Sequence, residues 1–273
     1  MKQIMPVVDP AKRDHKIAMN DLGKANVKKI NYFKEMGTPT YLRGGTSSGK
    51  SVLVRILCKM WGQKSASVAA NPQLLPESVV GMPAMINGNI EFLPGPLTLA
   101  IRNGWVFDME EFTRLPGDIQ ARFFAICDEG FRSYPISELG VLDEPVHDDF
   151  YFIATGNPVE AGYLTHELDR ALIDRFAIID LGNENMIDEP EVLVNLFGGD
   201  QSYTERMMNF ASDLRGKENG ATHITARQLI QASKAIAIGM PPLDAIEHLI
   251  AEKFVDSKEV IKTAATLHFT DQL

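Results

Sequence analysis

The sequence predicts an α/β fold: a five-stranded parallel sheet with helices on both faces, followed by a small helical lid domain. Three observations predict it. Short apolar runs alternate with helical stretches in the first two thirds of the chain, a glycine-rich loop joins the first run to a helix, and the chain beyond residue 186 is helical in period. Strands that alternate with helices are typical of parallel sheets covered on both faces.

The elements follow in order. A first helix is expected at about 24–36, ended by Gly37. Short strands are expected at 40–43, 105–107, 151–154 and 176–179, because each is a brief apolar run bounded by polar or turn residues, and 67–69 is a weaker candidate. Helices are expected between them at about 50–61, 119–128 and 168–174, and in the final part at 191–197, 203–214, 226–238, 242–252 and 258–267.

Three regions are expected: an N-terminal helical arm at 1–37, an α/β domain at 38–185 and a helical domain at 186–273. The boundary follows from Gly182, Asn183 and Pro190, which cluster where the strand pattern ends. Two hairpins are expected as inserts in the α/β domain. One lies at about 82–96 around Asn87-Gly88, a strong turn dipeptide, and the other at about 130–146.

Composition excludes several classes of protein. The 273 residues carry a formal net charge of −9, which disfavours general binding of nucleic acid phosphates. The lysines of the first 35 residues are mixed with acids, which favours a solvated helix face. No apolar run approaches the roughly 20 residues of a membrane helix, and the N-terminus lacks the apolar core of a signal peptide. A cytoplasmic protein without a membrane segment is therefore expected.

A phosphate-binding loop is the strongest motif in the chain. Residues 44–51 match GxxxxGK[ST] between an expected strand and an expected helix. Such a loop turns successive backbone N–H groups toward phosphate oxygens, and the helix N-terminus adds a positive dipole end. The lysine reaches the β and γ phosphates and the last hydroxyl binds Mg²⁺. The expected nucleotide ligands are Gly44, Gly45, Thr46, Ser47, Ser48, Gly49, Lys50 and Ser51.

Carboxylates follow the strand at 105–107, where hydrolysis needs one acid to hold the metal and another to act on water. Two registers are open. In the first, Glu110 serves the metal and Glu111 acts as the base. In the second, Asp108 serves the metal and Glu110 acts as the base.

The sequence resembles the MoxR-type AAA+ ATPases, and more loosely the CbbQ/NorQ, midasin and dynein motor modules, from about Thr40 to Arg227. The loop at 44–51 and the acidic segment at 110–116 carry the resemblance, with Glu110 where the family has Asp and Glu111 where it has Glu. The resemblance therefore favours the first register, in which Glu110 serves the metal and Glu111 acts as the base. It extends to residues 71–81 with 92–97, which are similar to the family's insert in its second helix, to 154–158, similar to a sensor strand, and to 171–176, similar to an arginine-finger segment.

The resemblance implies further site residues. Asn157, after the strand at 151–155, is expected to hydrogen-bond the γ-phosphate or the attacking water; a plain turn residue is the alternative. Arg175 is expected to reach the γ-phosphate bound by a neighbouring subunit, and Arg170 is a second candidate for this role. The alternative for Arg175 is a surface ion pair to Asp174 or Asp169. Arg227 loosely matches the family's second sensor; it is expected to contact the nucleotide, or else to be an ordinary surface arginine.

The function that the resemblance implies is Mg²⁺-dependent hydrolysis of ATP to ADP by a homo-oligomeric ring, expected to be a hexamer. The energy would remodel or mature a partner protein, as in a chaperone. Many MoxR relatives act with a von Willebrand A-type protein; this chain lacks the Asp-x-Ser-x-Ser motif, so such a partner would be separate. Two alternatives stay open: a DNA-acting motor or translocase subunit, supported by the basic N-terminal stretch, and a nucleotide-gated scaffold that does not hydrolyse.

Overall fold

The computed structural model describes residues 7–8, 19–128, 130, 133–136, 141–158, 165–181, 185–215 and 224–269. The chain divides into two compact units. The first holds residues 1–14 and 21–184, and the second holds residues 15–20 and 185–273. No helix in the described ranges is long and apolar enough to cross a membrane.

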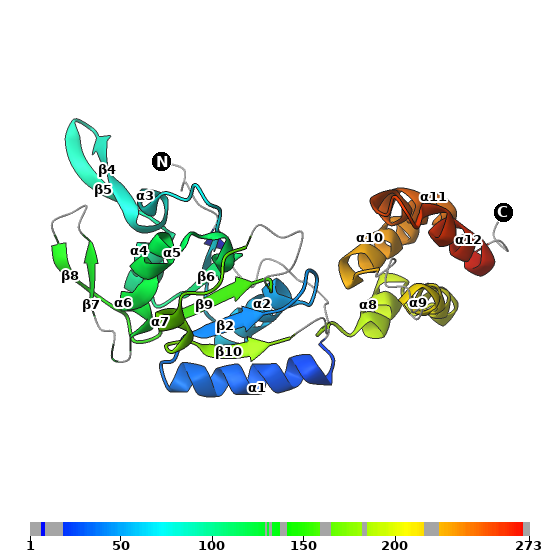
Figure 1. Cartoon of the computed structure of the whole chain (residues 1–273), viewed down its shortest axis with the longest axis horizontal. Coiled ribbons are helices and arrows are strands. Elements are labelled where there is room, and N and C mark those ends of the chain that lie inside the picture. Colours follow the sequence, from blue (N-terminus) through cyan, green and yellow to red (C-terminus); the bar gives the residue numbers. More distant parts are fainter. Residues whose placement is uncertain are drawn as a thin grey trace. The chain divides into compact units, whose positions relative to one another are not determined.

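The first unit is built on a sheet whose strand order is β1-β3-β6-β9-β2-β10. The last four of these strands can be followed in Figure 1. The five strands from β3 to β10 are mutually parallel, as predicted, and β1 adds an antiparallel edge to β3 that the sequence did not indicate. The strands are β1 (Val7–Val8), β2 (Thr40–Arg43), β3 (Ser65–Ala69), β6 (Val106–Glu110), β9 (Tyr151–Gly156) and β10 (Ala177–Asp180).

The register brings the carboxyl ends of the central strands together. Arg43, the last residue of β2, pairs with Gly156, the last of β9, and Ala69 of β3 pairs with Glu110 of β6. β2 has neighbours on both sides, β9 and β10, which come much later in the chain. Ligands of open α/β sheets bind beyond the carboxyl ends of the strands, at such changes of strand order.

Helices cover both faces of this sheet. α1 (Asp21–Glu35) packs with α2 (Lys50–Trp61), which lies over β6 and β9, and α4 (Pro96–Asn103) packs over β3 and β6. The side chains of β6 alternate between the faces. Phe107 and Met109 join a core cluster with Leu97 and Ile101 of α4, whereas Asp108 is near Arg55 of α2.

A group of phenylalanines fills the core beside the segments that carry candidate site residues. Phe112 and Phe176 directly follow Glu111 and Arg175, and their ring centroids are 6.2 Å apart. Phe152 of β9 lies 6.3 Å from the first and 5.5 Å from the second. All three are at least 94% buried, so the backbone next to both site residues is fixed by packing.

Both predicted inserts are antiparallel hairpins. β4 (Gly81–Ile86) and β5 (Asn89–Pro94) turn at Asn87 and Gly88, whose φ angles of 51° and 87° are those that a tight two-residue turn requires. The second hairpin pairs β7 (Ser133–Ile136) with β8 (Val141–Pro145). Residues 137–140, which join these two strands, lie outside the described residues.

The expected helix at 119–128 is wrong as a single helix. The segment forms α5 (Gly117–Gln120), the 3-10 turn η3 (Ala121–Phe123) and α6 (Phe124–Cys127). Phe123 has φ of −92° and ψ of 0°, and the 3-10 turn that it ends separates the two short α-helices. The other short helices of the unit are α3 (Pro76–Val80), η2 (Phe112–Arg114) and α7 (Arg170–Ile173).

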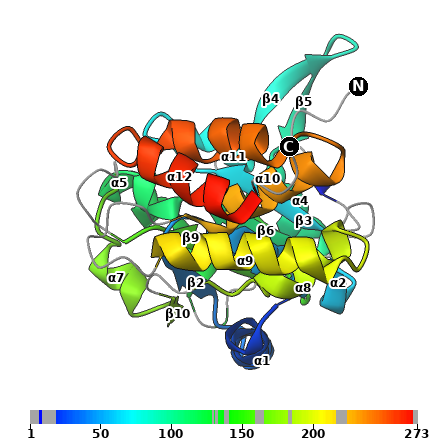
Figure 2. The same cartoon turned by 90° about the vertical axis from the view of Figure 1, so that its right-hand side faces the viewer.

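The second unit is a helical bundle with its own core (Figure 2). α12 packs against α9 and α11, and α10 packs against α8 and α11. Arg215 at the end of α9 forms a two-pronged ion pair with the buried Glu189 of α8, at 2.7 and 3.0 Å. The elements are α8 (Glu189–Leu196), α9 (Gln201–Arg215), α10 (Ala226–Ala237), α11 (Pro242–Leu249), η5 (Ala251–Lys253) and α12 (Lys258–Phe269).

The expected N-terminal arm is not a separate region. α1 belongs to the first unit, and its Ile30 is fully buried there. Met19 instead pairs with Ile187 of the second unit, and the side-chain amide of Asn20 donates to the carbonyl of Asn185 at 2.7 Å. The expected arm is therefore divided between the two units. Residues 15–20 belong to the second unit, and the helix at 21–35 belongs to the first. The units themselves separate between residues 184 and 185.

Candidate active site

The glycine-rich loop connects β2 to α2 at the carboxyl edge of the sheet. Ser47 and Gly49 adopt left-handed backbone conformations, with φ of 66° and 96°. The backbone N–H of Gly44 donates to the carbonyl of Gly156 at 3.2 Å, and that of Ser48 donates to Gly45 at 3.3 Å. The loop is therefore curled and tied to the end of β9, which is the shape that an anion-binding loop requires.

The start of α2 is suited to phosphate. Gly49 occupies the N-cap and makes no side-chain capping hydrogen bond to the first amides of the helix. The hydroxyl of Ser47 is buried and has no hydrogen-bond partner among the described residues. Thr46 lies beside it in the loop, and Ser51 is half-buried in the first turn of the helix. A helix N-terminus without a side-chain cap, at the end of a glycine-rich loop, fits a nucleotide phosphate tail.

Lys50 links the loop to the neighbouring strand. Its ammonium group donates to the carbonyls of Gly44 and Gly45 at 2.7 and 2.8 Å, and to the hydroxyl of Ser48 at 3.3 Å. It also donates to the side-chain oxygen of Asn157 at 3.2 Å. The lysine thus lies within the loop, and the residue that follows β9 is in direct contact with it.

Glu111 lies at the other side of Asn157. The amide of Asn157 donates to the carboxylate of Glu111 at 3.4 Å, and Arg114 donates to the same oxygen at 3.0 Å. Glu111 has φ of 58°, and its backbone N–H donates to the hydroxyl of Thr155 at 3.4 Å. This left-handed turn ends β6 and aims the carboxylate back toward β9. Asn157 therefore bridges Lys50 and Glu111.

The two remaining acids differ in exposure. Asp108 is only 3% exposed; one of its oxygens accepts a hydrogen bond from Ser67 at 3.4 Å, and the other has no partner in the described part of the chain. Burial, and then the nearby charge of Glu110, raise the pKa of Asp108 to about 8. Glu110 is half-buried and projects from the same face of β6, two residues nearer the carboxyl edge.

Arg175 lies near the amino ends of the parallel strands, at the opposite end from the phosphate loop. It precedes β10, whose first residue, Ala177, pairs with Thr40 at the start of β2. The ion pair of Arg175 is not formed with Asp174 or Asp169, the two partners expected as the alternative. The guanidinium is paired with Asp128, at the end of α6.

Arg227 belongs to the second unit. It is exposed in the first turn of α10, which Thr225 and Gln228 cap with reciprocal hydrogen bonds. This cap fixes the start of the helix, so the arginine is held at a defined helix terminus.

Sequence patterns missed three residues of this region. Arg114 and Thr155 hold Glu111 in place, and Asp128 holds Arg175. Only Arg114 carried a local signal, since it stands three residues after Glu111 and a helical turn brings such pairs together. The other two contacts join residues 44 and 47 positions apart.

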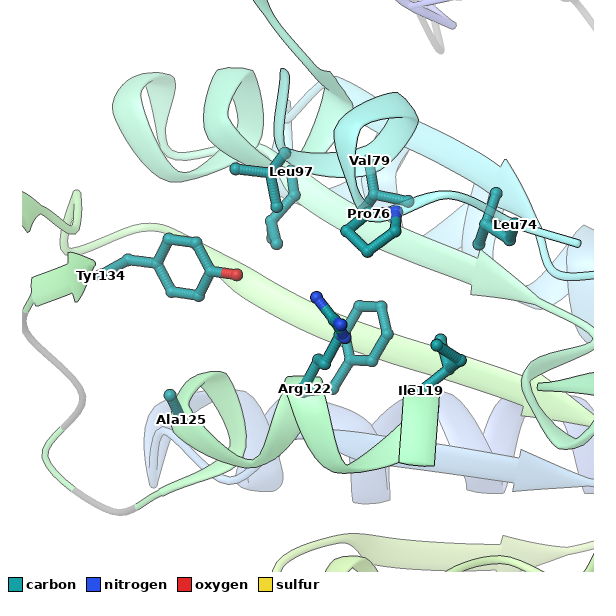
Figure 3. Close-up of a pocket in the computed structure, with 10 residues that line it drawn as sticks. Leu74, Pro76, Val79, Leu97, Ile119, Arg122, Ala125 and Tyr134 are labelled. Atoms are coloured by element: carbon teal, nitrogen blue, oxygen red, sulfur yellow. The ribbon is translucent and has the colours of Figure 1, made fainter. Parts of the chain in front are cut away.

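A separate hollow of about 230 Å³ lies between α3, α4 and the α5–α6 segment (Figure 3). Apolar side chains line most of it, and Arg122 and Tyr134 point into it. None of the candidate site residues lines this cavity. It is therefore a feature distinct from the phosphate loop.

The strand order, the loop at 44–51 and the adjacent acids define a P-loop nucleotide-binding protein. Residues 39–176 match the model of the AAA domain of the dynein-related subfamily, and residues 189–268 match the C-terminal domain of CbbQ, NirQ and NorQ. The chain belongs to this family of MoxR-type AAA+ ATPases, as the sequence predicted, and it is an ATPase of the CbbQ/NorQ/NirQ type.

Named relatives match over most of the chain. Protein CbbQ of Hydrogenophilus thermoluteolus is 26% identical over 229 residues, which are 81% of this chain and 83% of the relative. Protein NorQ of Paracoccus denitrificans is 25% identical, over 81% and 82%. The denitrification regulatory protein NirQ of Pseudomonas aeruginosa is 25% identical, over 86% and 89%. These matches extend across both units.

Proposed function

We propose that the protein hydrolyses ATP with Mg²⁺ as a ring-shaped homo-oligomer, and that hydrolysis drives remodelling or maturation of a partner protein. One observation carries the hydrolytic part. Asn157 contacts both Lys50, in the phosphate loop, and Glu111, at the end of the acidic strand. A phosphate-binding group and a carboxylate suited to act on water therefore share one orienting residue.

Each residue at this edge has a distinct role in the proposal. Backbone amides of residues 44–51 and Lys50 hold the phosphates. Ser51 and Glu110 would hold Mg²⁺, which when bound neutralises charge on the phosphoryl oxygens. Glu111 accepts the proton of the attacking water or orients it, and Asn157 fixes the direction of the carboxylate. ADP stays on the same loop after the reaction.

Burial favours the register in which Glu110, and not Asp108, serves the metal. Asp108 is 3% exposed within β6, whereas Glu110 is half-buried at the last position of the strand, two residues nearer its carboxyl end. An acid that takes part in metal binding must be reachable from the ligand crevice. A glutamate is one methylene longer than the family's aspartate, so it reaches further from the same backbone position.

Arg175 supports hydrolysis between subunits. Arg175 lies near the start of β2, whereas the phosphate loop of the same subunit begins after Arg43, at the end of β2. The four residues of this strand span about 10 Å, which separates the arginine from that loop. The side chain is 34% exposed, so a neighbouring subunit can reach it. In the proposal it stabilises the γ-phosphate charge bound by the next subunit of a six-membered ring, an effect that is worth roughly 10³–10⁵ in rate. Arg227 would contact the nucleotide and link its state to the helical unit.

The partner in the proposal is a separate protein, with a von Willebrand A-type protein as the first candidate from the resemblance. A DNA-acting motor is less well supported. Lys34, one of the basic residues that suggested it, lies over the rings of Trp61 and Tyr151 at 5.1 and 5.7 Å. That lysine therefore packs against the body of the first unit and is not available as part of a free basic arm.

The deciding experiment is the steady-state ATPase rate of the wild type against Glu111→Gln. The variant keeps the shape of the side chain but cannot accept a proton. We expect the rate to fall at least tenfold while ATP binding is retained. Equal rates would overturn the hydrolytic role of Glu111 and favour a nucleotide-gated scaffold. Stimulation by DNA, and indifference to any protein partner, would favour the motor alternative.

A further inference from the structure

Asp128 holds the guanidinium of Arg175 in a fixed orientation. Nε of Arg175 donates to the Asp128 carboxylate, and Nη1 donates to the backbone carbonyl of Ala171 at 2.8 Å. The same guanidinium lies over the ring of Phe124, 5.4 Å from its centroid. Three different groups, from α6 and α7, thus contact one planar cation, which is more than a loose surface ion pair provides.

The contacts leave part of the cation available. No hydrogen bond joins Nη2 to any described residue, and the side chain of Arg175 is 34% exposed. Nε, the nitrogen nearest the stem, is the one engaged by the carboxylate. An arginine anchored in this way presents its outer nitrogen to a ligand, with less rotational freedom left to lose when the ligand binds.

The backbone that leads to Asp128 is anchored in the core of the first unit. It directly follows Cys127, which is 97% buried at the end of α6, and Phe124 packs against the main core cluster. On the other side, Arg175 is followed by Phe176, which is 94% buried in the same cluster. The backbones of both partners are therefore attached to one core cluster, which keeps the two side chains within reach of each other.

We propose that Asp128 is a positioning residue for Arg175, which it orients so that the guanidinium meets the phosphate bound by the neighbouring subunit. The inference rests on the proposed role of Arg175 in catalysis between subunits. Asp128 does not touch the nucleotide. It acts through the arginine, by restricting the rotamers of a long side chain to one direction.

Removing the carboxylate should lower the turnover number and leave nucleotide binding unchanged. For Asp128→Ala we expect kcat to fall on the order of 10- to 100-fold, because small errors in the position of a catalytic group have effects of this size. KM should stay within about twofold, since the subunit's own phosphate loop is intact. Asp128→Glu, which keeps the charge, should restore part of the rate. Asp118→Ala, at an exposed aspartate of α5, is the matched control and should keep the wild-type rate.

Mixed rings separate a positioning role from a structural one. Glu111→Gln inactivates a subunit's own site but leaves its arginine in place. Asp128→Ala leaves the subunit's own site intact but misplaces the arginine that it offers to its neighbour. Rings mixed from these two variants should regain activity at the interfaces where a Glu111→Gln subunit supplies the arginine. Rings mixed from Asp128→Ala and Arg175→Ala should regain none, because both variants lack the same function.

The outcomes distinguish the two proposals. If Arg175→Ala fails to complement Glu111→Gln, the role of Arg175 between subunits is wrong. If Arg175→Ala complements but Asp128→Ala does not, Asp128 is needed within its own site or for folding, and the positioning role is wrong. An unchanged kcat for Asp128→Ala also overturns it. Asp128→Asn, which keeps the size of the side chain, is used in the same mixtures if the alanine variant does not fold.

Discussion

Replacing Asp108 by asparagine tests whether this buried carboxyl group is protonated in the folded protein. The amide has nearly the same shape as a protonated carboxyl group, and its oxygen can still accept the hydrogen bond from Ser67. It cannot ionise. The substitution therefore removes the proton linkage at this position and leaves the packing beside α2 almost unchanged.

The expected sign follows from the raised pKa of Asp108, about 8 against an ordinary value of 3.8. Between these two values the folded protein binds the proton and the unfolded chain releases it. The free energy of unfolding of the wild type therefore falls as the pH rises through this window. At ~1.36 kcal/mol per pH unit, the contribution lost by pH 7 is on the order of 4 kcal/mol, and the asparagine variant does not lose it.

Urea unfolding at pH 5, 6, 7 and 8, without nucleotide or magnesium, measures this effect. Both tryptophans, Trp61 and Trp105, belong to the first unit, so their fluorescence follows the unit that contains Asp108. The variant should gain about 1.4 kcal/mol over the wild type for each pH unit between 5 and 7. A difference that does not change with pH would show that Asp108 is ionised in the folded protein and would refute the reasoning.

Two further predictions concern the carboxyl edge of the sheet. Glu110→Gln should lower kcat on the order of tenfold or more and raise the magnesium concentration needed for activity, whereas Asp108→Asn should keep most of the ATPase activity; the reverse result in a magnesium titration would assign the metal role to Asp108. Gly156→Ala should destabilise the first unit by about 1–3 kcal/mol in urea unfolding, because a Cβ there would lie 2.2 Å from the hydroxyl of Tyr41 and 2.9 Å from that of Thr113. Gly117→Ala, where a Cβ meets nothing within 4 Å, is the matched control, and equal losses for both would contradict the packing argument.

The sheet could be predicted from the sequence because its strands are buried on both faces. Runs such as Tyr151–Gly156 carry no polar alternation, and all six residues are buried. β3 gave a weaker signal since it is rich in serine and alanine, which are small enough to be buried without a strongly apolar pattern. The break in the segment at 117–127 could not be predicted, because tertiary packing of Phe123 against the core overrides a continuous helical period.

Local patterns identified the phosphate loop and its acids but not the contacts that orient them. The loop could be found because its backbone shape requires glycine at fixed spacing. The pairing of Asp128 with Arg175, and of Thr155 with Glu111, depends on which strands and helices are neighbours in the folded sheet. Asp108 and Glu110 differ in exposure because β6 is covered by other elements at Asp108 and less so at its last residue. The sequence alone does not show where that cover ends.

The phenylalanine group has a mechanical consequence. Phe112 is bonded to the residue proposed to act on water, and Phe176 to the residue proposed to serve the adjacent subunit; their rings are 6.2 Å apart, and Phe152 contacts both. Close-packed rings transmit displacement instead of absorbing it. A shift at the end of β6 would therefore be passed on to the backbone beside Arg175. In the proposed ring, the state of one nucleotide site would in this way affect the arginine offered to the next site.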